Sequence, residues 1–239
     1  MGILIINLIA IAIMSKISAL AALILFAPAF SIGVAMSLFI APGLLGNSVF
    51  TAVKIWGIAF PLFWVMRTNS TALRLPKFRW LEVKVGFSLG IIMFGAIALA
   101  YLLVGQQAID LSDLRTKALE VGITKPYLYI VGCIYWSFIN SLVEELTWRG
   151  FVISRLKALV SPSVAVVLAA LFFTAHHSLA LYGYTRNWLV VALGSLGVFG
   201  AGIVWAWCYS HYRSITPGYI SHILVDIAIA IIGYQLLFN

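Results

Sequence analysis

Charged residues are scarce in this chain of 239 residues: they make up 9% of it, with 15 Lys+Arg and 7 Asp+Glu. A soluble domain carries about a quarter charged residues, and fewer than half that number cannot cover a globule of this size. Hydrophobic residues reach 63%, and the mean hydropathy is +1.08. The composition therefore argues against a soluble enzyme, a disordered chain and a nucleic-acid-binding protein, although the net charge is +8.

Cysteine is also rare, and some peptidase signatures are missing. Cys133 and Cys208 lie in long apolar runs without a CxxC pair, so we expect two small buried hydrophobic side chains. The HExxH motif of zinc peptidases is absent. Ser221 adjoins His222 in sequence and so does not face it, which gives a serine mechanism little support.

Long apolar runs fill most of the chain. A membrane-spanning helix needs about 20 mostly apolar residues, and seven stretches qualify: about 18–41, 48–66, 82–105, 127–150, 163–183, 187–209 and 216–238. The opening run, residues 2–14, is too short to span the membrane alone. Three interpretations of it stay open: an interfacial helix, a signal-like stretch and part of an eighth span. We expect an all-α polytopic membrane bundle of seven transmembrane helices, or eight, forming one domain over residues 1–239.

Basic residues are unevenly distributed between the predicted loops. With the N-terminus inside, the basic residues near the inner ends of the spans are Lys16, Arg67, Arg74, Lys77, Arg79, Arg155, Lys157 and Arg213. The outer loops are uncharged at 42–47, hold only Arg186 at 184–187 and are mixed at 106–126, where apolar residues at helical spacing predict a short surface helix. This asymmetry predicts a multi-pass integral membrane protein with a cytoplasmic N-terminus and membrane lipids as partners.

Ionisable side chains inside the predicted spans are few, and such groups are costly in lipid and usually functional. They are Lys54, Glu144, Glu145, Arg149, His176, His177, His222 and Asp226. Because three C-terminal spans carry most of them, we expect one polar site built by the fourth, fifth and seventh spans. Lys54 lies near a span end, so we expect its side chain to reach the membrane interface and assign it no role.

The two acids of the fourth span have different surroundings. Glu145 and Arg149 are four residues apart, so a helix places them on one face as an ion pair. Glu144 is rotated by about 100° from Glu145 and has no basic residue on its own face. We therefore expect Glu144 to be a general base and Glu145 and Arg149 to be structural; a purely structural polar cluster between helices is the alternative.

The fifth and seventh spans contribute histidines. His222 and Asp226 are four residues apart and face the same way, so the acid can fix the imidazole tautomer or both can point at one substrate oxygen. His176 and His177 diverge by about 100°, so we expect only one of them to face the shared site and the other to hydrogen-bond locally. Periodicity does not choose between them.

These patches resemble the CPBP family, which comprises type II CAAX prenyl endopeptidases and bacteriocin-processing or immunity proteins, also called Abi-like. That family carries EExxxR, FxxxH and HxxxN or HxxxD on separate membrane helices. Here the motifs read Glu144-Glu145-Leu-Thr-Trp-Arg149, then Phe173-Thr-Ala-His176-His177, then His222-Ile-Leu-Val-Asp226. The resemblance covers about residues 125–239, while the N-terminal spans match only in being apolar.

The resemblance implies an intramembrane endopeptidase that cuts a membrane-associated or lipidated, CAAX-like substrate. It implies that Glu144 activates water, that His177 rather than His176 orients this water, and that His222 and Asp226 stabilise the oxyanion. The supporting residues are Glu145, Arg149 and His176.

Two kinds of alternative stay open. Two histidines and a carboxylate also fit zinc, but binding Glu144 to a metal would leave only the paired Glu145 as base, so we expect no metal. The chain could also be a proton-coupled transporter with a relay of Glu144, His177 and Asp226, or a non-catalytic immunity or scaffold protein.

Overall fold

The structure is a computed structural model that describes residues 2–68, 76 and 78–238, with side chains for residues 14–67, 76 and 78–238. Arg74 and Lys77, which the sequence places in an inner loop, lie outside the described residues. Within this part of the chain every regular element is a helix, which confirms the prediction of an all-α fold.

The helices follow one another through short connections. In chain order they are α1 (Gly2–Ala35), η1 (Met36–Ile40), α2 (Leu44–Thr68), α3 (Trp80–Ala100), η2 (Tyr101–Gly105), α4 (Gln106–Ala108), α5 (Leu111–Glu120), α6 (Pro126–Ile134), η3 (Tyr135–Asn140), α7 (Ser141–Glu144), η4 (Glu145–Val152), α8 (Ile153–Leu156), α9 (Pro162–Thr185), α10 (Trp188–Tyr212) and α11 (Thr216–Phe238). The η elements are π-helical, so in the fourth span they continue the helix with a wider turn rather than breaking it.

Seven helices of the described residues are long and apolar enough to cross a membrane, which confirms the predicted number. They are Met14–Ile40, Leu44–Arg67, Trp80–Ala108, Pro126–Leu156, Pro162–Thr185, Trp188–Tyr212 and Thr216–Phe238. The fourth is longer than predicted because α6, η3, α7, η4 and α8 form one continuous helical rod. The opening run, residues 2–14, lies within α1 and is therefore the first part of the first helix.

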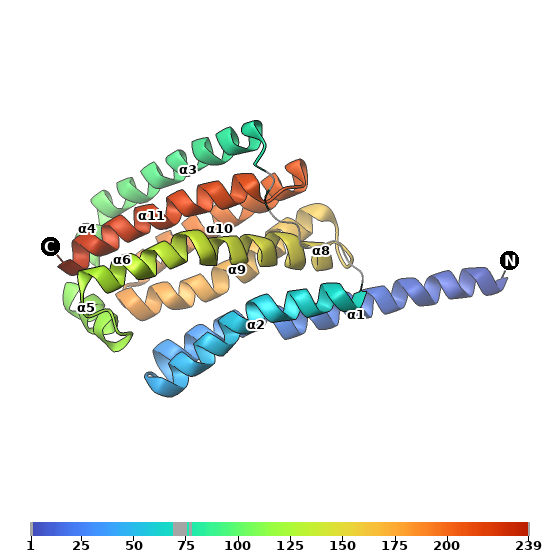
Figure 1. The fold of residues 1–239 in the computed structure, drawn as a ribbon, viewed down its shortest axis with the longest axis horizontal. Coiled ribbons are helices and arrows are strands. Elements are labelled where there is room, and N and C mark those ends of the chain that lie inside the picture. The colour runs from blue at the N-terminus through green and yellow to red at the C-terminus, as the bar shows by residue number, and fades with distance from the viewer. Residues whose placement is uncertain (1, 69–75, 77, 239) are drawn as a thin grey trace.

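The spans pack as a layered bundle (Figure 1). The helix α3 lies along α11, α9 lies along α10, and the α1–α2 pair lies against the face of the bundle formed by α9 and the fourth span. The two termini lie at opposite ends of the long axis, with the start of α1 projecting beyond the other helices.

An aromatic cluster joins the N-terminal pair to the fourth span. The Phe26 ring of α1 lies 5.3 Å from that of Phe151, and the Phe60 ring of α2 lies 5.9 Å from Phe151. All three side chains are buried. Burying large aromatic rings in close contact stabilises helix packing in the absence of a hydrophobic driving force from water. The cluster therefore positions α1 and α2 against the part of the chain that carries Glu144 and Glu145.

The surface helix expected between the third and fourth spans is present as α5. The Asp110 carboxylate caps it by accepting a hydrogen bond from the Ser112 backbone N–H at 2.8 Å, and its side-chain hydrogen bond with Ser112 lowers the pKa of Asp110. Ala118 faces inward and is buried. This confirms the predicted amphipathic helix at this end of the bundle.

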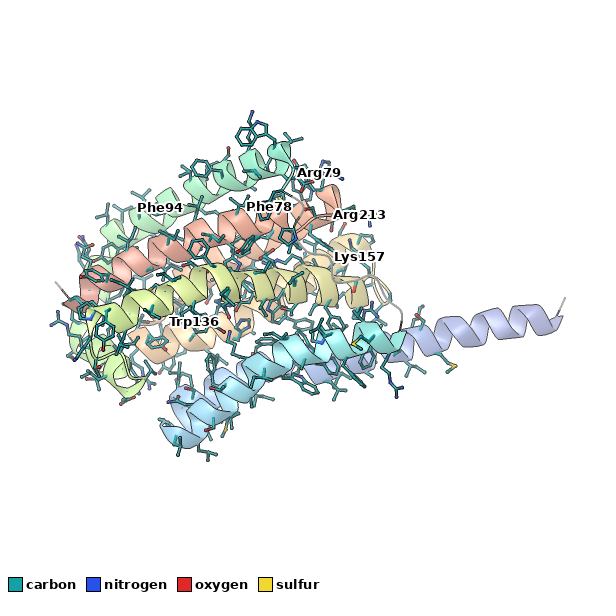
Figure 2. All side chains as sticks on the ribbon, in the orientation of Figure 1. Phe78, Arg79, Phe94, Trp136, Lys157 and Arg213 are labelled. Atoms are coloured by element: carbon teal, nitrogen blue, oxygen red, sulfur yellow. The ribbon has the colours of Figure 1, made fainter. Side chains whose placement is uncertain are left out.

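Basic residues gather at the opposite end of the bundle. Arg79, Lys157 and Arg213 lie there together in Figure 2. The Lys157 ammonium donates a hydrogen bond to Ser210 Oγ at 3.0 Å, and burial together with the nearby Arg213 cation lowers the pKa of Lys157. The fold thus groups on one side three of the charges that the sequence assigned to the inner side of the membrane.

Candidate active site

The Glu144 carboxylate lies inside the bundle with partners on two helices. Its side chain is 5% exposed. The Asn140 amide donates a hydrogen bond to Oε1 at 2.9 Å, and the Lys54 ammonium lies 3.5 Å from the same oxygen. The expectation that Glu144 lacks a counter-ion holds for its own helix but is wrong for the folded protein, because α2 supplies the cation.

Lys54 does not extend to the membrane interface as expected. Its ammonium donates a hydrogen bond to Asn140 Oδ1 at 2.8 Å and lies 4.5 Å from the centre of the Trp136 ring. Its side chain is 20% exposed. Sequence reasoning missed this residue because Lys54 and Glu144 are 90 positions apart. The available signal was a cation within a span, which usually has an acidic partner.

Glu145 has two partners rather than the one that helical spacing predicts. Arg149 Nε lies 3.4 Å from Oε2, as the four-residue spacing predicts. His222 Nδ1 lies 3.1 Å from Oε1, so the carboxylate also bridges to α11. A methyl group at Gly218 would overlap with Oε2, so a glycine at this position lets α11 approach the acid.

The Arg149 guanidinium is fully enclosed by the protein. It lies 4.5 Å from the centre of the Phe173 ring and 5.0 Å from that of Trp205, and its side chain is 2% exposed. Cation–π contacts of this kind stabilise a desolvated guanidinium. Arg149 thus holds together the fourth, fifth and sixth spans around Glu145.

His222 lies among three carboxylates. Its Nδ1 faces Glu145. Its Nε2 lies 3.8 Å from Glu144 Oε2 and 3.8 Å from Asp226 Oδ1. Its ring stacks on Trp205 at 4.2 Å. The acid that meets Nδ1 is therefore Glu145, whereas the four-residue spacing suggested Asp226 for this orienting role.

Asp226 has a hydrogen-bond partner of its own on the fourth span. Its Oδ2 is in hydrogen-bond contact with Ser141 Oγ, which also donates to the Trp136 carbonyl at 2.9 Å. The remaining oxygen, Oδ1, is the one nearest His222. The structure thus brings Asp226 to the edge of the site through α11 and Ser141.

Both histidines of the fifth span reach the Glu144 carboxylate, so the expectation that only one could do so is wrong. One ring nitrogen of His176, one of His177 and a Glu144 oxygen all lie within 4.8 Å of one another. The two rings lie next to each other, with centroids 4.3 Å apart, so both come near the same carboxylate although the residues diverge around the axis of α9.

The two imidazoles differ in their hydrogen bonds. His177 Nδ1 donates to the Phe173 carbonyl at 2.8 Å, which leaves Nε2 to face the site. His176 is buried and stacks on Trp148 at 5.4 Å, and neither of its ring nitrogens has a hydrogen-bond partner among the described residues. The Phe172 carbonyl, one turn before His176, nonetheless acts on this ring as a backbone acceptor, which is the kind of local partner expected for it.

The donor set at this point matches a metal site in its chemistry. Two imidazole nitrogens and one carboxylate oxygen are common zinc ligands, and an open fourth position would hold water. The Lys54 ammonium, 3.5 Å from Glu144, opposes a second cation at the same carboxylate. The residues present fit zinc by type, and the nearby Lys54 ammonium reduces the electrostatic attraction of the Glu144 carboxylate for such an ion.

We expected no serine-hydrolase GxSxG spacing in any span, but that expectation is wrong, because the third span contains one at Gly86-Phe-Ser88-Leu-Gly90. In the structure it lies within the uninterrupted helix α3 rather than on a strand-to-helix turn. The two glycines face Pro217 and Leu224 of α11, and Ser88 is exposed on the outside of the bundle. Close helix packing therefore explains this pattern.

Comparison with known families identifies the C-terminal part of the chain. Residues 126–228 match the family model described as type II CAAX prenyl endopeptidase Rce1-like. Over these residues, which make up less than half of the chain, the protein is similar to this family. No curated protein and no solved structure gives a significant match.

The Rce1-like segment runs from the start of α6 into α11 and contains the clustered acids and histidines described above. That family is one of peptidases, and the seven apolar helices support an integral membrane protein. Lys54 lies outside the Rce1-like segment, on a helix that the family model does not reach.

Proposed function

We propose that this Rce1-like protein is an intramembrane endopeptidase that hydrolyses a peptide bond of a lipidated, CAAX-like or otherwise membrane-associated substrate. The observation that carries the proposal is the convergence of four spans on Glu144. Lys54 and Asn140 contact Oε1 of this carboxylate, and Oε2 lies 3.8 Å from His222 Nε2. One ring nitrogen each of His176 and His177 lies within 4.8 Å of a Glu144 oxygen.

In the proposed reaction Glu144 acts as the general base. It takes a proton from a water molecule that His177 Nε2 orients, and the water oxygen forms a bond to the carbonyl carbon of the substrate. The proton then passes to the leaving amine as the carbon–nitrogen bond breaks. Water adds across the peptide bond, so the products are a new carboxylate and a new amine.

His222 and Asp226 are proposed to stabilise the oxyanion of the tetrahedral intermediate: His222 as the charged donor, and the ionised Asp226 by holding the positive charge on that ring, since Asp226 itself donates a hydrogen bond only when protonated. The site holds three carboxylates, Glu144, Glu145 and Asp226, near two permanent cations, Lys54 and Arg149. One additional proton on His222 would balance this charge, and the imidazolium would then donate from Nδ1 to Glu145 and from Nε2 to the oxyanion.

A zinc-dependent mechanism is the second candidate, because His176, His177 and Glu144 offer ligand atoms within 4.8 Å of one another. Bound zinc would supply Lewis-acid activation of water. The base would then have to come from elsewhere, and Glu145 already lies between Arg149 and His222. The metal-free mechanism uses each of these residues without conflict.

Hydrolysis of a prenylated peptide ending in a CAAX sequence, by the purified protein in lipid vesicles, tests the proposal. Glu144→Gln should lower kcat by about 10³-fold or more while the protein stays folded, since Gln keeps the side-chain shape but cannot accept the proton. Glu120→Gln, the same change on the exposed helix α5, is the matched control. An active Glu144→Gln variant, or a wild-type protein that cleaves neither the prenylated nor the unprenylated peptide, would contradict the proposal and favour a transport or non-catalytic role.

A further inference from the structure

Lys54 joins the N-terminal helices to the polar site through direct contacts. Its ammonium lies 3.5 Å from Glu144 Oε1 and 2.8 Å from Asn140 Oδ1, and the Asn140 Nδ2 donates to the same Glu144 oxygen. The three groups form a closed triangle in which each one contacts both others. The amide orientation of Asn140 is therefore fixed by a cation on one side and a carboxylate on the other.

Aromatic rings surround the rest of the Lys54 ammonium. It lies 4.5 Å from the centre of the Trp136 ring and 5.4 Å from that of Phe50. Such contacts stabilise an ammonium that is partly removed from water. Figure 2 shows Trp136 on the side of the fourth span that faces α2. The cation is thus held in one place rather than free to move to the membrane surface.

The packing of α2 does not depend on this lysine. Phe60, one and a half turns further along α2, packs on Phe26 and Phe151 and joins the helix to the bundle. An intramembrane ammonium is costly, so a lysine at a position where packing is already provided indicates a role in function.

The two oxygens of Glu144 consequently have different polar neighbours. Oε1 has both a cation and an amide donor, while Oε2 lies beyond hydrogen-bond distance of its neighbour His222 Nε2, at 3.8 Å. We propose that Lys54 is a positioning residue of the active site: with Asn140 it fixes Oε1 of Glu144 and leaves Oε2 as the atom that takes the proton from water. This inference rests on the proposed function. It adds that Oε2 is the basic atom of Glu144 and that α2 supplies the residue that positions it.

Steady-state kinetics of the full-length protein on the prenylated peptide test the inference. Lys54→Met keeps the length of the side chain and removes its charge, so kcat should fall on the order of 10²-fold, as expected when a reacting group is displaced, while KM changes by less than about twofold. Lys54→Arg keeps a cation and should restore most of the lost kcat. Lys84→Met is the matched control, because Lys84 also lies over an aromatic ring, that of Trp80, but is exposed on α3.

Chemical rescue separates the charge from the shape of the side chain. Alkylating Lys54→Cys with 2-bromoethylamine rebuilds an ammonium side chain, whereas iodoacetamide adds a neutral group of similar size. Only the first adduct should regain activity, and wild-type protein treated in parallel accounts for Cys133 and Cys208. Equal activity of the two adducts, an unchanged kcat for Lys54→Met, or a rise in KM alone would overturn the inference.

A thermodynamic cycle covers the case in which Lys54→Met folds poorly. Melting temperatures of Lys54→Met, Glu144→Gln and the double variant should be non-additive, with the double variant more stable than the sum predicts, because both charges are removed together. Additive effects would show that Lys54 acts independently of Glu144 and would overturn the inference. Failure of the proposed function gives a different result, namely an active Glu144→Gln variant.

Discussion

His222 Nδ1 donates a hydrogen bond to Oε1 of Glu145 at 3.1 Å, across the contact between α11 and η4. The other oxygen of this carboxylate faces Arg149, so Glu145 connects a buried guanidinium to the imidazole that faces Glu144. Glu145 therefore fixes which nitrogen of His222 is turned toward the site. The sequence spacing predicted for Glu145 only an ion pair within its own helix. In the structure Glu145 also orients a side chain of α11.

Removing the Arg149 side chain should impair folding more than catalysis. Arg149→Ala leaves Glu145 as a buried carboxylate without its cation and empties the space beside Phe173 and Trp205, which should cost about 3–5 kcal/mol. We expect a lower folded yield and a lower melting temperature in detergent. Adding Glu145→Gln to this variant should restore part of the yield. A well-folded, inactive Arg149→Ala protein would instead place Arg149 in the reaction.

The two histidines of α9 should differ in their effect on turnover. His177→Ala should remove nearly all activity, because His177 Nε2 is held toward the site by the Nδ1 hydrogen bond to the Phe173 carbonyl. His176→Ala should keep a substantial part of the activity, with a loss that follows the loss of packing on Trp148. Activity and melting temperature measured on both variants decide this. Full activity in His177→Ala together with an inactive, stable His176→Ala would reverse the assignment.

Exhaustive chelation should leave the activity unchanged. In the metal-free mechanism, the group of His176, His177 and Glu144 needs no metal ion. Purified protein should contain no stoichiometric zinc by elemental analysis. About one zinc ion per chain, lost and regained in step with activity, would support the zinc-dependent alternative.

Labelling of single cysteines tests the orientation that the basic residues predict. Ser112 on α5 and Ser161 before α9 are exposed and lie outside the membrane-spanning helices. With a cytoplasmic N-terminus, an impermeant maleimide should label Ser112→Cys in intact cells and Ser161→Cys only after lysis. The unmodified protein measures the background from Cys133 and Cys208. Reversed labelling of the two positions would invert the topology.

Much of the fold could be predicted because lipid imposes a simple rule on the chain. A segment that crosses the membrane must be helical and apolar for about 20 residues, so seven runs of such residues gave seven helices within the described part of the chain. The three motifs could be located for the same reason, since ionisable residues stand out against apolar runs. The ion pair of Glu145 and Arg149 could be predicted because both residues lie on one helix, four positions apart.

The site itself depended on contacts between helices that the sequence does not encode locally. Helical angles predicted that one of His176 and His177 would turn away, but both reach Glu144 because α9 runs beside the fourth span. Wider π-helical turns at η3 and η4 flank Glu144, and no periodicity in the residues signals them. The partner of His222 Nδ1 likewise came from a different helix than its spacing suggested.

By itself the sequence determined the helical class, the number of spans and the residues available for chemistry, because hydropathy and spacing are properties of one segment at a time. Only the tertiary structure decided which charges meet. Lys54 and Glu144 lie on spans that are separated in sequence by the whole third span. Their ion pair exists because the aromatic cluster of Phe26, Phe60 and Phe151 packs α2 against the fourth span. Charges in an apolar medium must find partners, but the packing of the whole bundle selects them.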